Sequence, residues 1–322
     1  MTASKRFLYL SEETLAGLDI ATGEAIEAIE ELIHGRSLAK VWSAPKAVVQ
    51  PPDGRYMMAT LAASDDPPFM SVKSLIMNAR NTERGLPQIN SLVTLLDGET
   101  GMPVAVMDGN WITAVRTAAL SAVAAKRMAR PESSRAAFIG CGVQAQSHLQ
   151  AFASMFPLTE IRACGRGPTN IEALCQSAED LGLSAAAFVS AKEAVSGADL
   201  IISSVTYSAE LEPFLDARWL KPGSFSTVPD LAVPWVKDSL SEFDRIVIDD
   251  VEQEASMANK LVRSDLVAGD LSGLVLAEID GRHEDGERTA FIFRAHPLGD
   301  LALAVLAYQK ARERSRGTTI TA

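Results

Sequence analysis

The stretch Ala136–Ala145, AAFIGCGVQA, is the most informative part of this sequence. Its apolar start, Ala136–Ile139, is typical of a short buried strand, and the pattern G-x-G-x-x-A follows directly. One glycine would make the tight turn, the next would let the backbone approach a pyrophosphate, and a small third residue would let helix and strand pack closely. The N-terminus of the following helix would offer free N–H groups to phosphates. The stretch thus predicts dinucleotide contacts from Gly140, Gly142, Val143, Gln144 and Ala145.

Downstream of this turn, short apolar runs alternate with helical stretches. Such alternation is typical of βαβ units and of a parallel sheet. It favours the dinucleotide interpretation over the alternative, an ordinary tight βα turn. We therefore predict an α/β fold with a Rossmann-type, doubly wound parallel sheet over residues 129–299. The strands expected after the first one are Glu160–Cys164, Ala185–Val189, Leu200–Val205, Ser224–Val228 and Arg245–Ile248.

Upstream, the sequence predicts a mixed α+β domain. One helix is expected over residues 11–36, and an Ala-rich helix over Thr113–Arg130. The apolar run Leu301–Tyr308 has helical spacing and is expected to return to this domain. The first domain is thus predicted to comprise residues 1–128 together with a C-terminal helix at about residues 300–322. Its strands are expected at residues 47–49, 56–61, 69–77, 89–96 and 103–107.

The composition argues against several classes of function. A net charge of −11 disfavours nucleic-acid binding, because a binder needs a basic face to neutralise phosphates. The three cysteines, Cys141, Cys164 and Cys175, include no C-x-x-C pair, and no two of the four histidines have metal-ligand spacing, so no metal site is predicted. The first residues lack the apolar core of a signal peptide, and no uncharged run reaches the roughly 18 apolar residues of a membrane span. We expect a cytoplasmic protein that binds neither membranes nor nucleic acid.

The end of the second expected strand bears on the choice of cofactor. NAD enzymes usually place an acidic residue there for the ribose 2′-hydroxyl, and the segment Arg162–Gly167, RACGRG, has none. Arg166 would instead meet the 2′-phosphate of NADP, with Thr169 adding a hydrogen bond, which favours NADP over NAD. The alternative is a solvated Arg166 in an enzyme that uses NAD without an acidic anchor. Thr206, after the fourth strand, is a further candidate contact or simply a strand-terminating threonine.

Three motifs together resemble the ornithine cyclodeaminase/mu-crystallin family. They are MDGNWITAVRTAA at Met107–Ala119, GCGVQAQSH at Gly140–His148, and GAD at Gly197–Asp199. The resemblance covers roughly residues 40–310 and is closer to mu-crystallin than to the cyclodeaminases. It implies an NAD(P)-dependent homodimer with an N-terminal dimerisation and substrate domain, completed by the C-terminal helix. It also implies a Rossmann domain, with the active site in the cleft between the two domains.

The resemblance assigns basic residues of the first domain to a substrate carboxylate. Lys73 and Arg116 match two of the family positions, and Lys46 stands where the family usually has an arginine. Lysine is a point charge and cannot hold a carboxylate through two parallel hydrogen bonds. Lys73, if it points inward, would donate a proton to an imine or polarise it; the alternative is a lysine on the solvent face of its strand. Thr117, directly after Arg116, is added to the candidate cofactor contacts.

Three further positions bear on the substrate. Asp230 matches an aspartate that cyclodeaminases set beside the substrate amine, although a strand-end aspartate is also a common cap. Cyclodeaminases carry a glutamate where this chain has the run Tyr56–Ala59, without an acid, which argues against cyclodeamination. Arg294 is an additional positive charge that would hold a second substrate carboxylate, as in iminosuccinate; the alternative is an exposed or structurally paired arginine. His148 is expected to serve in packing or capping.

The sequence therefore predicts an NAD(P)H-dependent reductase of 2-imino acids. The small anionic substrate would be a cyclic ketimine, such as pyrroline- or piperideine-2-carboxylate, or iminosuccinate, which would yield aspartate. Alternatives are an amino acid dehydrogenase, which runs the same chemistry backwards, and a cyclodeaminase that releases ammonia. A third alternative, not an enzyme, is an NADPH-regulated protein that binds a small ligand.

Overall fold

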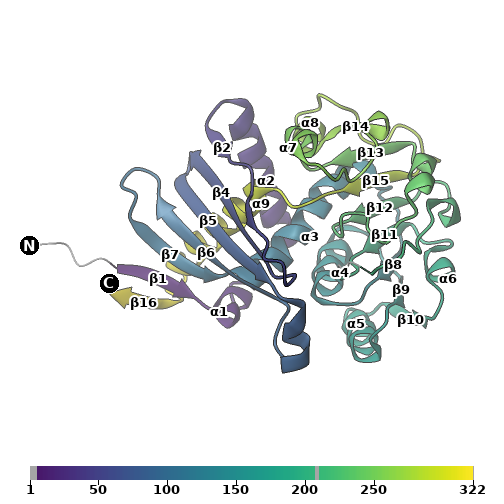
Figure 1. Cartoon of the computed structure of the whole chain (residues 1–322), viewed down its shortest axis with the longest axis horizontal. Coiled ribbons are helices and arrows are strands. Elements are labelled where there is room, and N and C mark those ends of the chain that lie inside the picture. Colours follow the sequence, from purple (N-terminus) through teal and green to yellow (C-terminus); the bar gives the residue numbers. More distant parts are fainter. Residues whose placement is uncertain (1–5, 207–209, 322) are drawn as a thin grey trace, which may run out of the picture. The chain divides into compact units, whose positions relative to one another are not determined.

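The computed structural model describes residues 6–206 and 210–321 (Figure 1). The chain forms two compact units, Met1–Arg116 with Pro297–Ala322, and Thr117–His296. We call them the mixed-sheet unit and the parallel-sheet unit. The division falls inside helix α3, Gly109–Met128, rather than at its end. Residues 1–5 and 322, which the predicted first domain includes, lie outside the described residues.

The mixed-sheet unit contains one eight-stranded sheet with the order β16-β1-β7-β6-β5-β4-β2, and β3 pairs with β4 beside this path. Strand β16, from the C-terminal end, pairs with β1 from the start of the chain (Figure 1). The five strands expected from the sequence are confirmed, and β1, β2 and β16 are additional short strands at its edges or beside them. The bounds are β1 Arg6–Leu10, β2 Val41–Ser43, β3 Ala47–Val49, β4 Tyr56–Asp65, β5 Pro68–Met77, β6 Ile89–Asp97, β7 Pro103–Asp108 and β16 Thr318–Thr321.

Two helices occupy the N-terminal region where the sequence predicts one. Helix α1, Glu12–Ala16, ends at Gly17, and Asp19 has a left-handed backbone with a φ of 48°. Helix α2 then spans Thr22–Ser37. The single helix expected over residues 11–36 is therefore wrong, because the chain leaves the helical conformation between Gly17 and Asp19.

Helix α9, Pro297–Glu313, covers one face of the mixed sheet. It contacts α2 and strands β4, β5 and β6, and most of its residues are buried (Figure 1). Along β5, Lys73 and Leu75 point to this covered face, whereas Met70 and Ile76 are exposed on the other. The sheet thus has one covered face, which includes Lys73, and one exposed apolar face.

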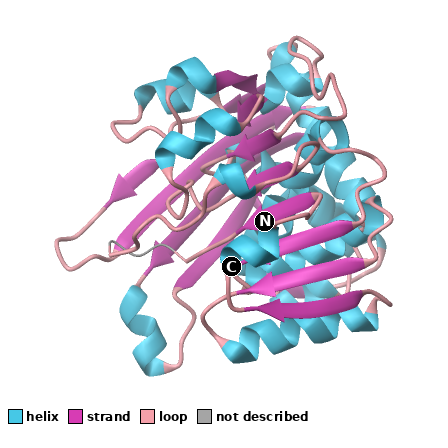
Figure 2. Ribbon diagram, turned by 90° about the vertical axis from the view of Figure 1, so that its right-hand side faces the viewer, coloured by secondary structure: helices cyan, strands magenta, loops and turns pink. Residues whose placement is uncertain are grey.

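The parallel-sheet unit contains an eight-stranded sheet with the order β10-β9-β8-β11-β12-β15-β13-β14, in which every pair is parallel. Helices α4 and α5 lie on one side of it and α6 on the other (Figure 1), and Figure 2 shows the strands flanked by helices. This is the predicted doubly wound arrangement; β14 and β15 are additional to the prediction. The strands are β8 Arg135–Ile139, β9 Glu160–Cys164, β10 Ser184–Phe188, β11 Leu200–Ser203, β12 Phe225–Val228, β13 Arg245–Ile248, β14 Val267–Asp270 and β15 Thr289–Ile292. The helices are α4 Val143–Met155, α5 Pro168–Asp180, α6 Ala191–Val195, α7 Val251–Ser256 and α8 Leu271–Val275, and the short 3-10 helices of the chain are Ala79–Arg84, Ala217–Trp219, Lys237–Glu242 and Ser264–Leu266.

The order of these strands positions the cofactor turn. The winding reverses between β8 and β11, which are neighbours in the sheet although β9 and β10 lie between them in the chain. Open parallel sheets bind ligands at this reversal, beyond the carboxyl ends of the strands. Strands β8, β11, β12 and β15 are buried almost throughout, so the loops that follow them start from a rigid base. Gly140 and Ser204 begin two of these loops.

Candidate active site

Lys73 is buried inside the mixed-sheet unit and contacts an acid. Its side chain is fully enclosed, and Nζ donates to Asp300 Oδ1 at 2.7 Å and to Thr113 Oγ1 at 3.4 Å. The alternative that Lys73 lies on the solvent face of its strand is therefore wrong. A buried ammonium keeps its charge only with partners of this kind.

Arg116 lies beside the same acid. Its Nε is 3.0 Å from Asp300 Oδ1, and its side chain is 3% exposed. Asp300 Oδ2 accepts a further hydrogen bond from Thr60 Oγ1 at 3.0 Å. Arg116 Nη1 is enclosed and has no hydrogen-bond partner among the described residues. We call Lys73, Arg116, Asp300, Thr60 and Thr113 the buried charge cluster.

The electrostatics of this cluster favour an additional anion. Burial and the nearby Arg116 lower the pKa of Lys73 to about 8, although Asp300 opposes the change. Burial alone would raise the pKa of Asp300, but its two cationic neighbours hold that pKa below the usual value. Two cations therefore share one carboxylate in an enclosed place, and an unbalanced buried charge costs several kcal/mol. A bound carboxylate would balance it and would give Arg116 Nη1 a partner.

Asp300, Thr60 and Thr113 are the members of the site that the sequence reasoning missed. Asp300 lies in the first turn of α9, within the run Leu298–Val305, which is otherwise apolar or glycine. An acid within an otherwise apolar, buried run is a signal that could have been found, because a buried carboxylate requires a cation or several donors. Thr60 is opposite Lys73 in the β4–β5 pair. No sequence pattern indicates that pairing.

Lys46 lies immediately before β3 and is partly buried. Its positive charge is among the influences that lower the pKa of Lys73. The structure therefore brings Lys46 into the electrostatic neighbourhood of Lys73, alongside Arg116. The three basic residues predicted to hold a substrate carboxylate thus belong to one region of the mixed-sheet unit.

The cofactor turn has the features of a pyrophosphate site. Gly140 has a φ of +90°, and a Cβ at this position would lie 2.5 Å from Ser204 O. Gly142 precedes α4 in an ordinary extended conformation, no side chain caps that helix, and a Cβ on Gly142 would meet nothing within 4 Å. The helix N-terminus therefore has open space in front of its N–H groups.

The residues after Gly142 complete this turn. Val143 is exposed at the helix start, Ala145 is fully buried, and Gln144 Oε1 is enclosed without a hydrogen-bond partner among the described residues. The small Ala145 lets α4 pack closely on the sheet, as the sequence pattern requires. The residues present thus fit a dinucleotide.

The other predicted cofactor contacts differ in exposure. Arg166 and Thr169 are exposed after β9, at the start of α5, and Arg166 makes no ion pair with another described residue. No acidic side chain occupies this strand end. Thr206 is exposed after β11, whereas Thr117 is buried in α3.

Asp230 follows β12 and is held by one of its two oxygens. Oδ2 accepts hydrogen bonds from Ser203 Oγ at 2.5 Å and from the Val205 backbone N–H at 3.1 Å. Trp235 Nε1 in turn donates to Ser203 Oγ at 3.2 Å. Oδ1 is enclosed and lacks a hydrogen-bond partner among the described residues, and burial raises the pKa of this carboxyl to about 7.

Arg294 forms an ion pair and hydrogen bonds with residues of the parallel-sheet unit. Its Nε is 2.8 Å from Glu254 Oε2, and its guanidinium also donates to the carbonyl of Asn259. Its backbone N–H donates to Asp249. These contacts match the structural alternative and give no support to the prediction that Arg294 meets a second substrate carboxylate.

His148 has a structural role, as expected. It is fully buried, and burial lowers its pKa to about 4, so the ring is neutral. Nδ1 donates to Gln144 O at 2.7 Å, and Nε2 accepts from Ser121 Oγ at 2.8 Å. Thr227 Oγ1 donates to that serine at 2.7 Å. This chain of hydrogen bonds links α3, α4 and β12.

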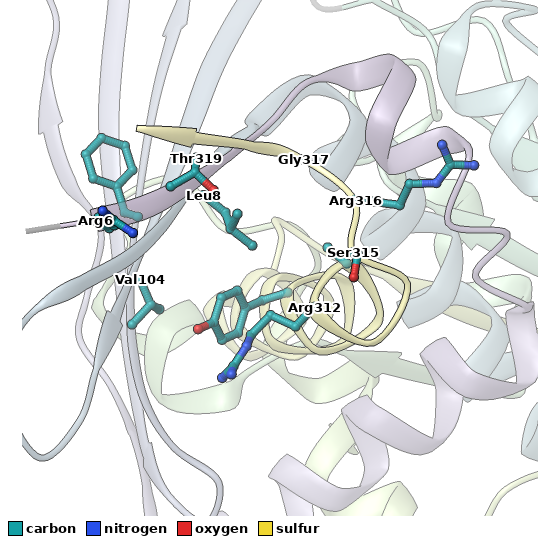
Figure 3. A pocket seen from close by; sticks show the side chains of 11 residues that line it. Arg6, Leu8, Val104, Arg312, Ser315, Arg316, Gly317 and Thr319 are labelled. Atoms are coloured by element: carbon teal, nitrogen blue, oxygen red, sulfur yellow. The ribbon is translucent and has the colours of Figure 1, made fainter. Parts of the chain in front are cut away.

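A pocket of about 410 Å³ lies elsewhere in the mixed-sheet unit, beside β1, β16 and the end of α9. Arg6, Arg312 and Arg316 line it, and all three are exposed. Figure 3 shows Arg312 and Arg316 pointing in different directions. Asp300 lies about 18 Å away along the helix axis from Arg312. We assign no ligand to this pocket.

Two features are absent from the described residues. No helix among residues 6–206 and 210–321 is both long and apolar enough to cross a membrane. Within the same ranges, no three histidine, cysteine or acidic side chains are grouped so that they could hold a metal ion.

Comparison with known proteins identifies a family for this chain and several similar solved structures. A model of the ornithine cyclodeaminase/mu-crystallin family matches residues 10–315. Δ1-Pyrroline-2-carboxylate reductase of Thermococcus litoralis, solved with NADH and L-proline, has a TM-score of 0.88 and 25% identity over 98% of this chain and 100% of its own. An archaeal alanine dehydrogenase dimer with bound NAD has a TM-score of 0.87 and 28% identity over 98% and 99% of the two chains. Iminosuccinate reductase of Paracoccus denitrificans with NAD⁺ has a TM-score of 0.84 and 26% identity over 98% and 100%.

Proposed function

Because the chain belongs to the ornithine cyclodeaminase/mu-crystallin family, we propose that it is an NAD(P)H-dependent reductase that converts 2-imino acids into amino acids. The observation that carries this proposal is the buried charge cluster, in which Lys73 and Arg116 share the single carboxylate of Asp300. The similar solved proteins include two imine reductases, which supports the same reaction class.

The substrate carboxylate would bind at the two cations. Arg116 offers an enclosed Nη1 without a partner, and guanidinium groups bind carboxylates through paired hydrogen bonds. Lys46 adds a third positive charge near Lys73. The affinity for an anion would thus come mainly from Lys73 and Arg116, which share the single carboxylate of Asp300.

Lys73 would supply the proton of the reaction. Bound NAD(P)H supplies a hydride to the imine carbon. A proton on the imine nitrogen makes the imine carbon electrophilic enough to accept that hydride. An ammonium with a pKa of about 8 is charged at neutral pH yet releases a proton readily. Enclosure of Lys73 also excludes water, which strengthens its electrostatic effect on the substrate.

Asp230 is the second group that we assign to proton handling. Ser203 and Val205 fix one carboxylate oxygen and leave Oδ1 without a partner. Its pKa of about 7 would let it exchange a proton with the substrate nitrogen near neutral pH.

The ion pair between Arg294 and Glu254 favours a substrate with one carboxylate. With its guanidinium paired to Glu254, no additional cation is assigned to a second carboxylate. We therefore propose a cyclic ketimine, such as pyrroline- or piperideine-2-carboxylate, in preference to iminosuccinate. The reverse reaction would be an amino acid dehydrogenation.

For the cofactor we propose a preference for NADPH over NADH. The end of β9 has no acid for a ribose 2′-hydroxyl, and the exposed Arg166 lies beside the start of α5, where no side chain caps the helix. A cation next to free helix N–H groups suits a 2′-phosphate. The similar solved proteins contain NADH or NAD, so the proposed preference is supported by the residues of this chain alone.

We also propose that the protein is a cytoplasmic homodimer that pairs through the exposed face of the mixed sheet. Met57, Leu61, Met70, Ile76 and Leu92 are each 44–48% exposed and lie on that face of adjacent strands. Exposed apolar surface of this kind is typical of an interface. Leu61→Asp should give monomers in light scattering, whereas Leu181→Asp, at an exposed leucine of the parallel-sheet unit, should not. The three unpaired cysteines fit a reducing compartment.

The decisive test is a reductive screen with both cofactors. The panel should contain pyrroline- and piperideine-2-carboxylate, and 2-oxo acids mixed with ammonia or methylamine, oxaloacetate among them. We expect NAD(P)H oxidation with a cyclic imine. Ammonia release from a diamino acid without net NADH would favour a cyclodeaminase instead. Tight cofactor binding without turnover across the panel would favour a binding protein and would contradict the proposal.

A further inference from the structure

Asp300 contacts both cations of the buried charge cluster. Its Oδ1 is 2.7 Å from Lys73 Nζ and 3.0 Å from Arg116 Nε, and its Oδ2 accepts from Thr60 at 3.0 Å. The three partners come from β5, α3 and β4, so one carboxylate joins three elements of the mixed-sheet unit. Its side chain is 2% exposed.

The position of Asp300 in the fold stabilises its negative charge and holds its carboxylate in one orientation. It lies in the first turn of α9, where the helix dipole favours negative charge, and the surrounding turns of α9 are buried. With both oxygens occupied by hydrogen bonds or an ion pair, the carboxylate has one preferred orientation. A rigid acceptor of this kind restrains the long, flexible side chains of a lysine and an arginine.

We propose that Asp300 is a positioning residue that fixes the Lys73 ammonium and the Arg116 guanidinium for the substrate and keeps Lys73 protonated at neutral pH. This inference rests on the proposed imine reductase function. Asp300 acts through the two cations and contacts neither substrate nor cofactor in this role.

The charges that face Lys73 show why one acid has this effect. Arg116 from α3 and Lys46 from the segment before β3 both repel its proton, and burial disfavours the charged form. Among the groups named here, Asp300 from α9 raises the pKa of Lys73, through its charge and its hydrogen bond. With an amide in place of Asp300, burial and the two cations would lower the pKa of Lys73 further, because the opposing effect of the carboxylate would be lost.

The first experiment is the pH dependence of kcat/KM for Asp300→Asn. Lys73 must be protonated to act, so activity in the wild type should fall as the pH rises through about 8. In Asp300→Asn this fall should move by at least about one pH unit to lower pH. The same imine is used throughout, so its own ionisation is common to all variants. An unmoved profile in a folded Asp300→Asn protein would overturn the inference.

Two control variants separate positioning from simple structural support. Thr60→Val removes one hydrogen bond to Asp300 but keeps its charge, so it should leave the pH profile in place. Asp300→Glu keeps the charge but shifts it by one methylene, so the profile should stay near pH 8 while kcat/KM falls roughly tenfold or more. In a Lys73→Met background, Asp300→Asn should add little further loss of kcat, because the proton donor that Asp300 holds is already absent, while loss of its contact with Arg116 should act on KM.

A direct titration of Lys73 makes the inference independent of turnover. In protein labelled with ¹³Cε-lysine, the Lys73 resonance is assigned by its loss in Lys73→Arg. It should titrate near pH 8 in the wild type and at lower pH in Asp300→Asn. A wild type that reduces no imine would contradict the proposed function, whereas the same Lys73 titration in both proteins would contradict the role of Asp300. If Asp300→Asn does not fold, Asp300→Glu decides: a kcat/KM equal to that of the wild type would overturn the inference.

Discussion

Asp300 Oδ1 lies 2.7 Å from Lys73 Nζ, although 227 positions separate the two residues in the chain. The contact joins the first turn of the last helix to the middle of β5. It fixes a lysine whose pKa is lowered to about 8 beside an arginine with an unpartnered Nη1. This pair is therefore central to the anion binding that we propose for the buried charge cluster.

Lys73→Met should abolish most imine reduction without preventing cofactor binding. The change removes the proposed proton donor, and loss of a general acid typically lowers the rate by roughly 10²–10⁴-fold. The cofactor turn belongs to the other unit, so NADPH affinity measured by calorimetry should stay unchanged. Lys40→Met, at an exposed lysine, is the matched control and should keep full kcat. Normal turnover of Lys73→Met with every imine would contradict the mechanism.

Arg116→Lys should weaken substrate binding more than it slows the reaction. The variant keeps the positive charge but loses the planar pair of donors that suits a carboxylate. We expect KM for the imine to rise by roughly 10–100-fold, which corresponds to about 1–3 kcal/mol, with a smaller change in kcat. Steady-state kinetics with a cyclic imine measures both. An unchanged KM would show that the substrate carboxylate binds elsewhere.

Gly142→Ala should weaken cofactor binding, whereas Gly140→Ala should lower the stability of the fold. A Cβ on Gly142 meets no protein atom within 4 Å, so this variant should fold normally but obstruct the pyrophosphate and raise the cofactor Kd at least about tenfold. A Cβ on Gly140 would lie 2.5 Å from Ser204 O at a φ of +90°, so that variant should lose roughly 1–3 kcal/mol of stability. Calorimetry of cofactor binding and melting of the protein without cofactor separate the effects. Equal cofactor affinity in Gly142→Ala and wild type would refute the predicted phosphate contact.

Arg166→Ala should reduce the use of NADPH and spare NADH. The exposed guanidinium would contribute a charged hydrogen bond to a 2′-phosphate, of which NADH has none. KM for NADPH should rise about tenfold or more, whereas KM for NADH should change little. Arg218→Ala, at an exposed arginine that pairs with Asp216, serves as the control. An equal rise in KM for NADPH and for NADH would contradict a role for Arg166 in distinguishing the two cofactors.

His148 should make stability depend on pH on the acidic side. Its pKa is lowered from 6.5 to about 4 in the folded protein, so the unfolded chain binds one more proton between these values. Stability is therefore fully present above pH 6.5 and falls as the pH drops towards 4, by up to about 3 kcal/mol from this group. Urea unfolding at fixed protein concentration should show this slope, and His148→Gln should reduce it by one proton. The same slope in both proteins would mean that the pKa of His148 is the same in the folded and unfolded states.

The architecture of the parallel-sheet unit follows from local sequence. Its strands are short apolar runs between helical stretches, and burial on both faces of the sheet requires such runs. The strand β15 was missed because Thr289–Ile292 is short and follows a charged loop rather than a helix. The break between α1 and α2 was missed because helical periodicity continues across Gly17–Asp19 although the backbone does not.

The sequence by itself determined the dinucleotide turn at Gly140–Ala145, the family, and the basic residues Lys73 and Arg116 as candidates. These features depend on residues that are neighbours in the chain, because turn geometry and the periodicity of apolar residues are local properties of the sequence. Only the tertiary structure decided that Asp300 and Thr60 join Lys73, and that Arg294 is engaged by Glu254. The physical reason is that a buried charge must find its partner in space, and the partner is set by how strands and helices pack rather than by spacing along the chain.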